Sequence, residues 1–188
     1  GGSFSVARAD KGANPRFAYT RSAPLAPAAL ATGTSKRDIA TLASLSDTLL
    51  NQRTLGAVEE ILFDSSVDNR RIQGWIVKPP GFDTTKKYPL LLEIHGGPFA
   101  SYGPTFAAEI QLYAAAGYVV LYLNPRGSTG YGEEFADLIH HDYPDNDYGD
   151  LMSGVDAVLG RGYADSTRLF VTGGSGGGVP TAWIGGQT

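Results

Sequence analysis

A single serine within a run of glycines is the feature of this sequence best suited to chemistry. Ser175 lies between Gly173 and Gly177 in the pattern G-x-S-x-G, which is the spacing of a nucleophile elbow. Such a serine is held on a strained turn, where side chains two residues before or after it would collide with the neighbouring strand and helix. The Ser175 hydroxyl would then stand at a helix N-terminus, whose free N–H groups can face a developing oxyanion. The chemistry indicated is nucleophilic attack on a carbonyl carbon.

The flanking residues favour an elbow over two simpler interpretations. Leu169 to Val171 form a short apolar run of β type, and Ala182 to Ile184 continue into what we expect to be a helix. A flexible glycine-serine linker would not be expected to join two such segments. A phosphate-binding loop also lies between a strand and a helix, but no frame here reads G-x-G-x-x-G and no G-K-[ST] follows. We therefore predict a strand, a sharp turn and a helix over residues 168–183.

A regular alternation of strands and helices precedes the elbow and would position it. Strands are expected at residues 58–65, 71–78, 88–95, 118–123 and 168–172, and helices at 106–116, 133–141 and 148–159. The nearly continuous apolar strands are typical of strands covered on both faces. The first two strands are most simply a hairpin. Repeated β-then-α order predicts an α/β fold with a doubly wound, mostly parallel sheet.

The first 52 residues have a different character. Ser3 to Val6, Arg16 to Thr20 and Ile39 to Leu42 alternate like short strands, and Pro24, Pro27 and an alanine-rich patch separate the second from the third. Two or three short strands cannot bury a face by themselves. We therefore expect these residues to be the end of a larger β structure.

A second glycine motif follows the strand at 88–95. His95 to Pro98 read His-Gly-Gly-Pro, and ligands collect at the carboxyl ends of strands in open α/β sheets. The N–H of Gly97 is a candidate second oxyanion donor beside the N–H of Gly176. The alternative is an ordinary Gly-Pro turn. His95 precedes Ser175 in the chain, whereas the histidine of such a triad comes last, so we expect it to shape the turn.

Other charged residues have simpler interpretations than catalysis. Arg126, among the glycines of residues 124–132, either contacts a substrate carboxylate or is paired to hold its loop. Asp147 and Asp150 lie where carboxylates favour a helix N-terminus, which predicts helix capping. His140 and His141 end a predicted helix and are expected to face solvent.

Composition excludes several classes of function. The 188 residues carry a net charge of −4 with both signs interspersed, so no basic surface for nucleic acid is expected. No run of about 18 apolar residues predicts a membrane span. The chain has no cysteine and three histidines, which argues against a disulfide framework and a structural zinc site. No basic-then-apolar leader precedes Ser3, so we expect no targeting segment and an internal start, and the compartment stays open.

The motifs together resemble the prolyl oligopeptidase family of serine peptidases, in particular its acylaminoacyl-peptidase and dipeptidyl-peptidase-like branches. The resemblance rests on residues 73–75, 94–98, 124–132 and 172–178, in unbroken order within about 53–188. It implies that 53–188 are the N-terminal part of an α/β-hydrolase domain and that 1–52 are the end of a β-propeller and a linker. It further implies Ser175 as the nucleophile, Gly97 and Gly176 as oxyanion donors, short peptides as substrates, and no metal or organic cofactor.

The sequence departs from that family in three places. Gly176 replaces the larger residue usual after the serine, and Val179-Pro180 stand where an aromatic residue and a leucine are common. The Asp and His of the triad, which the family carries well downstream of the serine, are not in this chain. We therefore expect a piece of a longer enzyme that is inactive alone. The strand before Ser175 would be an uncovered edge, which predicts pairing with the missing C-terminal half or with a second copy of the chain. A carboxylesterase on the same scaffold and a catalytically silent interaction module remain alternative functions.

Overall fold

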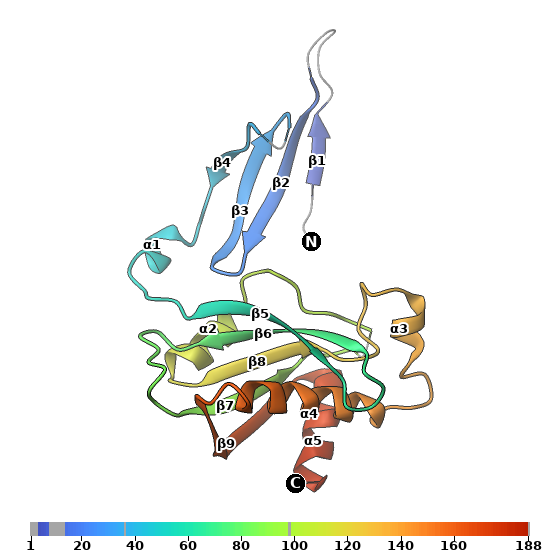
Figure 1. Ribbon diagram of the computed structural model, residues 1–188. Coiled ribbons are helices and arrows are strands. Elements are labelled where there is room, and N and C mark those ends of the chain that lie inside the picture. The colour runs from blue at the N-terminus through green and yellow to red at the C-terminus, as the bar shows by residue number, and fades with distance from the viewer. Residues whose placement is uncertain (1–3, 8–13, 36, 98, 188) are drawn as a thin grey trace. The chain divides into compact units, whose positions relative to one another are not determined.

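The computed structural model describes residues 4–7, 14–35, 37–97 and 99–187 (Figure 1). Its contacts divide the chain into two compact units. The smaller unit comprises Gly1–Thr54 and Pro104–Ala107, and the larger unit comprises Leu55–Gly103 and Ala108–Thr188. Ser175 and both glycine motifs belong to the larger unit.

The smaller unit is a four-stranded antiparallel sheet in the order β1-β2-β3-β4. Its strands are β1 (Phe4–Ala7), β2 (Arg16–Ala23), β3 (Ala26–Gly33) and β4 (Ala40–Ala43), and the short helix α1 (Asp47–Leu50) follows. Strand β3 was not expected from the sequence, because alanine and proline disfavour strands. Pairing with a neighbour on each side outweighs that preference, and Ala31 is fully buried. The expected first strand included Ser3, which lies outside the described residues.

The larger unit is built on a five-stranded sheet in the order β5-β6-β8-β7-β9. Its strands are β5 (Ala57–Asp64), β6 (Arg71–Lys78), β7 (Tyr88–Ile94), β8 (Val119–Asn124) and β9 (Ala164–Gly173). The predicted hairpin is confirmed, since β5 and β6 pair antiparallel in register from Ala57 to Asp64. The expectation of a mostly parallel sheet is wrong: β6 pairs with β8 antiparallel, and only β7 with β8 and β7 with β9 are parallel. The fold is mixed α/β.

Helices cover both faces of this sheet. They are α2 (Ala108–Ala115), α3 (Glu133–Asp137), α4 (Asn146–Leu159) and α5 (Gly178–Gln187), with a 3₁₀ turn at Ser175–Gly177. Gly154 of α4 packs so closely on Leu123 that an added Cβ would lie 2.5 Å from the leucine Cδ2. Helix α2 lies on the opposite face. Its Ala114 and the Val77 side chain of β6 both lie against Gly56. Val77 pairs with Val120, whose side chain points to the face opposite to that of Leu121 and Leu123, because side chains alternate along a strand.

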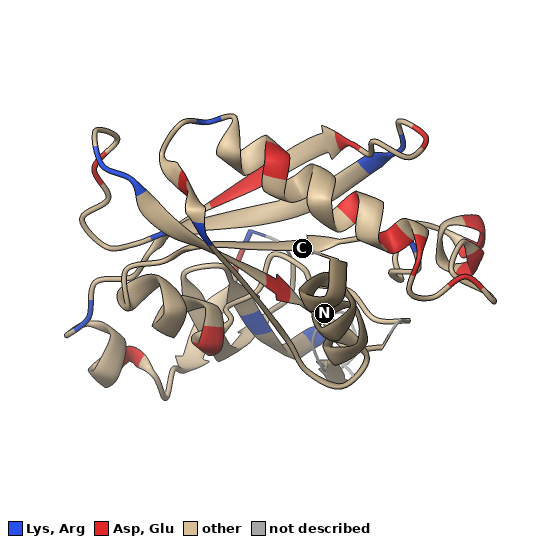
Figure 2. Ribbon diagram, turned by 90° about the horizontal axis from the view of Figure 1, so that it is seen from below, with Lys and Arg blue, Asp and Glu red and all other residues tan. Residues whose placement is uncertain are grey.

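Helix α3 is shorter than predicted and ends at Asp137. The turn that follows contains His141, whose φ of +61° cannot belong to a right-handed helix. His140 and His141 are exposed and their rings stack with centroids 4.1 Å apart. In the part of the chain that the structure describes, no helix is long and apolar enough to cross a membrane. Figure 2 shows acidic and basic residues scattered over the described ribbon.

The sheet brings the candidate motifs to one edge. Every residue of β8 is buried, and parallel β7, β8 and β9 end on the same side. Ile94 pairs with Gly173, so the turns after β7 and β9 start side by side. Strand β9 pairs only with β7 among the described strands, and its Leu169 and Phe170 are 45% and 48% exposed.

Candidate active site

Ser175 sits on a strained turn between β9 and α5. Its φ is +54°, one of three positive values found at non-glycine residues in the described chain, and this conformation costs on the order of 1–3 kcal/mol. Gly174 before it is extended, with φ −104° and ψ 153°. The chain thus reverses sharply at the serine and enters a 3₁₀ turn and then α5. This is the geometry that the glycine spacing predicts.

The glycines two residues away on either side are required by close backbone contacts. A Cβ on Gly173 would lie 2.6 Å from the Gly177 carbonyl oxygen and 2.9 Å from the Ile94 carbonyl oxygen. A Cβ on Gly177 would lie 2.7 Å from the His95 carbonyl oxygen and still closer to that of Ile94. Since real Cβ atoms do not approach so closely, the expected collision on the side of the neighbouring strand β7 is confirmed for both positions, and Gly173 would also collide with the turn that leads into α5.

The turn after β7 lies directly against the residue after the serine. A Cβ on Gly176 would lie 2.5 Å from the carbonyl oxygen of Gly97 and 2.7 Å from its nitrogen. Gly97 itself has φ +132°, a conformation that suits glycine. The structure therefore brings the two expected oxyanion donors to adjoining positions on the backbone. Pro98, the last residue of the second glycine motif, lies outside the described residues.

His95 holds that turn in place. Its Nδ1 lies 2.7 Å from the Gly96 carbonyl oxygen and so carries the proton that it donates, while its Nε2 lies 2.9 Å from the Ser128 hydroxyl, from which it accepts. Burial lowers the pKa of the imidazole, which favours this neutral form. In the described chain no hydrogen bond joins His95 to Ser175. The ring connects the turns after β7 and β8.

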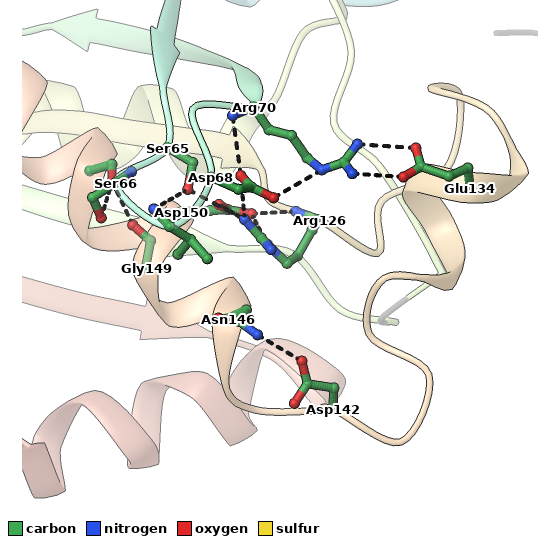
Figure 3. A network of polar contacts seen from close by, with 12 residues as sticks. Ser65, Ser66, Asp68, Arg70, Arg126, Glu134, Asp142, Asn146, Gly149 and Asp150 are labelled. Atoms are coloured by element: carbon green, nitrogen blue, oxygen red, sulfur yellow. Dashed lines mark hydrogen bonds and ion pairs between the residues drawn. The ribbon is translucent and has the colours of Figure 1, made fainter.

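Arg126 anchors the loop after β8. It is 5% exposed and donates from Nε and from a terminal nitrogen to the two oxygens of Asp150, both at 2.9 Å. The same terminal nitrogen reaches Asp68 at 3.1 Å, and Asp68 and Glu134 bind Arg70 (Figure 3). The Asp150 and Asp68 carboxylates raise the pKa of the guanidinium further. Of the two roles expected for Arg126, the structure favours loop anchoring.

Two expectations for the start of α4 have different outcomes. Asp147 accepts a hydrogen bond from the N–H of Asp145 at 2.7 Å, so its carboxylate does satisfy a backbone donor at the helix start. Asp150 does not cap the helix: it is fully buried, binds the Arg126 guanidinium and accepts the Arg126 backbone N–H at 2.8 Å. Sequence spacing cannot reveal this partner, which lies 24 residues away on another element.

Tyr143 contacts the elbow from the turn before α4. Its hydroxyl donates to the carbonyl oxygen of Gly176 at 2.6 Å, 33 residues along the chain. The peptide unit that follows Gly176 is thereby tied to a side chain outside β9 and α5. Sequence analysis missed this residue, because a tyrosine in a polar loop gives no signal of a distant backbone partner.

Glu93 is a second residue that sequence analysis missed. It is 8% exposed near the carboxyl end of the apolar strand β7, and burial and the nearby Glu109 raise its pKa to about 7. The sequence did offer one sign of this residue, because Glu93 is the only acidic residue in a strand that is otherwise apolar from Leu90 to Ile94. The nearby Tyr102 hydroxyl opposes this rise in the Glu93 pKa, and Asn124 fixes the Tyr102 backbone through bonds of 2.8 and 3.1 Å.

The elbow, the adjoining glycine turn and the mixed sheet define a serine hydrolase scaffold. Residues 104–188 match the prolyl oligopeptidase family, and the chain belongs to that family.

Its relatives include both solved structures and curated proteins. An uncharacterized peptidase, YuxL, of Bacillus subtilis is 44% identical over 148 residues, which are 78% of this chain and 22% of that protein. Dipeptidyl-peptidase 5 of Schizosaccharomyces pombe is 38% identical over 151 residues, with 77% and 22% covered. The acylaminoacyl peptidase of Pyrococcus horikoshii superposes with a TM-score of 0.81 at 30% identity, covering 93% of this chain and 27% of that one. The chain thus spans about a quarter or less of the length of these relatives.

Proposed function

We propose that this chain carries the nucleophile of a serine peptidase that hydrolyses short peptides. The observation that carries the proposal is the strained Ser175, with φ +54°, on a turn where Gly173 and Gly177 admit no side chain. Strain of this kind is maintained at functional sites because the surrounding structure over-determines it. Family membership supports peptide chemistry, and the curated relatives include a dipeptidyl-peptidase.

In the proposed reaction, the Ser175 hydroxyl oxygen attacks the scissile carbonyl carbon and forms a tetrahedral intermediate. The N–H groups of Gly97 and Gly176 donate hydrogen bonds to its oxyanion. The amine leaves with a proton, and an acyl-enzyme remains until water attacks it and releases the acid. No metal or organic cofactor takes part in this scheme.

The general base of this reaction is proposed to come from outside the chain. Of the three histidines, His95 uses both ring nitrogens on Gly96 and Ser128, and His140 and His141 are exposed and stacked on each other. A serine without its base loses on the order of 10⁴ to 10⁶ in rate. We therefore infer that residues 53–188 are the N-terminal part of a peptidase domain, active only in the longer protein.

We propose that residues 1–52 are the end of a β-propeller and a linker. Four short strands paired antiparallel in chain order are the arrangement found in one propeller blade. Limited proteolysis of the natural protein would test this: a stable fragment beginning near residue 53 supports the boundary, whereas persistent protection across residues 45–60 contradicts it.

The activity is tested with the natural gene product that contains this chain. Ser175→Ala should abolish hydrolysis of dipeptidyl and acylaminoacyl p-nitroanilides. Full activity of this variant would mean that another group is the nucleophile, whereas a wild type that hydrolyses none of these substrates would favour a silent interaction module. Turnover of p-nitrophenyl esters without any cleavage of anilides would instead favour a carboxylesterase, because the elbow does not distinguish an ester from an amide.

A further inference from the structure

A pocket of about 400 Å³ opens beside the elbow, on the face of the sheet that α2 covers. Gly96 and Gly174 form its border with the serine, since a Cβ on Gly96 would lie 3.2 Å from the Gly174 carbonyl oxygen and 3.4 Å from the Ser175 Cβ. Glu93 and Glu109 supply its charged side chains. Among the described residues that line it, none is lysine or arginine.

The Glu93 carboxyl group points to a ligand because one of its oxygens has no partner. The residue is 8% exposed, and Oε2 is buried without a hydrogen bond in the described structure. A buried polar atom in this state costs about 1–3 kcal/mol, and more when it is charged. Glu109, whose Oε1 accepts the Tyr113 hydroxyl at 2.8 Å, adds a second carboxylate near it. Two like charges beside an empty acceptor favour a cation between them.

The wall of the pocket fits an organic cation. The Tyr102 ring packs edge-on against His95, with centroids 5.2 Å apart, and against Tyr122, at 5.0 Å, and an aromatic ring beside carboxylates is favourable for an ammonium group. A metal ion fits less well: Mg²⁺ and Ca²⁺ prefer six or more oxygen ligands, and the described residues include no group of three or more His, Cys, Asp or Glu placed to hold one.

The position along the strands matches a peptide bound at Ser175. Glu93 pairs with Thr172, three residues before the serine, which corresponds to about 10 Å at the usual rise of a strand. The amino terminus of an extended dipeptidyl group lies about 7 Å from the scissile carbonyl by the same rise, and the glutamate side chain can cover the difference. A lysine side chain near the scissile bond could also reach it.

We propose that Glu93, assisted by Glu109, binds an ammonium group of the peptide substrate and so determines specificity. The proposal rests on the proposed peptidase function and names its substrate class: peptides with a positive charge near the scissile bond. The shared chemistry is a primary ammonium, and its source is either the free amino terminus or a lysine side chain.

The test compares three anilide substrates with the natural gene product that contains this chain. These are Ala-Ala-p-nitroanilide with a free amino terminus, its N-acetyl derivative, and N-acetyl-Lys-Ala-p-nitroanilide. Glu93→Gln should lower kcat/KM by at least about tenfold for whichever ammonium-bearing substrate the wild type prefers. It should change kcat/KM for acetyl-Ala-Ala-p-nitroanilide by less than about threefold. Loss of preference for the free terminus identifies the α-ammonium, and loss of preference for lysine identifies the side chain.

Controls keep the outcome decisive. Asp156→Asn removes an exposed carboxylate of α4 and should leave all three values unchanged. If thermal melting shows that Glu93→Gln is not folded, Glu109→Lys is used in its place. The ammonium group of the new lysine should occupy the pocket and abolish the preference for ammonium-bearing substrates. A preference that survives either folded variant overturns the inference while leaving the peptidase function intact. If the wild type hydrolyses none of the substrates and Ser175 takes up no fluorophosphonate, the proposed function fails, and the inference falls with it.

Discussion

An alanine at position 176 would close the space through which the two glycine turns approach each other. Its Cβ would lie 2.5 Å from the Gly97 carbonyl oxygen, whereas ordinary contact begins near 3.4 Å, so one turn must move by roughly 1 Å. A displacement of that size at a reacting centre lowers the rate by about 100-fold. Losing one oxyanion donor costs about 10² to 10³. We therefore expect Gly176→Ala to lower kcat/KM for a peptide anilide at least 100-fold.

Gly178→Ala is the matched control. A Cβ there meets only the Gly173 carbonyl oxygen, at 3.6 Å, and Gly178 already has helical angles of φ −66° and ψ −27°. Alanine should therefore leave kcat/KM within about threefold and raise stability by about 0.5–1 kcal/mol. Both variants are assayed by anilide hydrolysis and checked by thermal melting. A folded Gly176→Ala protein with activity near that of the wild type would refute the idea that Gly97 and Gly176 must adjoin for catalysis.

Three further perturbations follow from the same geometry. Asp150→Ala leaves the buried Arg126 guanidinium without its main partner and should cost about 3–5 kcal/mol in urea unfolding; a loss below 1 kcal/mol would show that the ion pair is not what anchors the loop. Tyr143→Phe removes the hydrogen bond to the Gly176 carbonyl and should lower kcat more than it raises KM, while equal activity would mean that this bond does not position the elbow. The pKa of Glu93 is raised from 4.5 to about 7, so the folded state favours the protonated carboxyl group. The stabilisation that the protonated Glu93 gives to the fold is therefore full below pH 4.5 and is lost as pH rises through 7. As pH rises from 4.5 to 8, the free energy of unfolding of Glu93→Gln should therefore increase by up to ~3 kcal/mol relative to that of the wild type. A difference between the two proteins in urea unfolding that stays constant across that range would contradict the raised pKa of Glu93.

The sequence predicted the elements of the larger unit because their signals are local. The apolar runs at residues 88–95 and 118–123 correspond to the buried strands Tyr88–Ile94 and Val119–Asn124. The glycine spacing around Ser175 correctly predicted a turn with close backbone contacts at Gly173 and Gly177. Strand direction was not predictable. Antiparallel β6 carries as many buried apolar residues as parallel β7, so periodicity cannot distinguish them.

The remaining errors arise from partners that lie far apart in the chain. Asp150 has the sequence position of a first-turn helix residue, yet it binds Arg126, and the burial of both made this pairing necessary. Strand β3 forms from residues of low β propensity because β2 and β4 supply its hydrogen bonds. Glu93 gave only the signal of a charge within an apolar strand. Such residues depend on tertiary contacts rather than on spacing.

Whether Ser175 is the nucleophile is decided by the mass of the natural gene product before and after treatment with a fluorophosphonate, which labels activated serines. We expect a protein several times heavier than 19.8 kDa that gains one adduct, mapped by peptide sequencing to Ser175, and a Ser175→Ala variant that gains none. A folded natural protein that takes up no adduct, or takes it up at another serine, would contradict the assignment of Ser175 as the nucleophile.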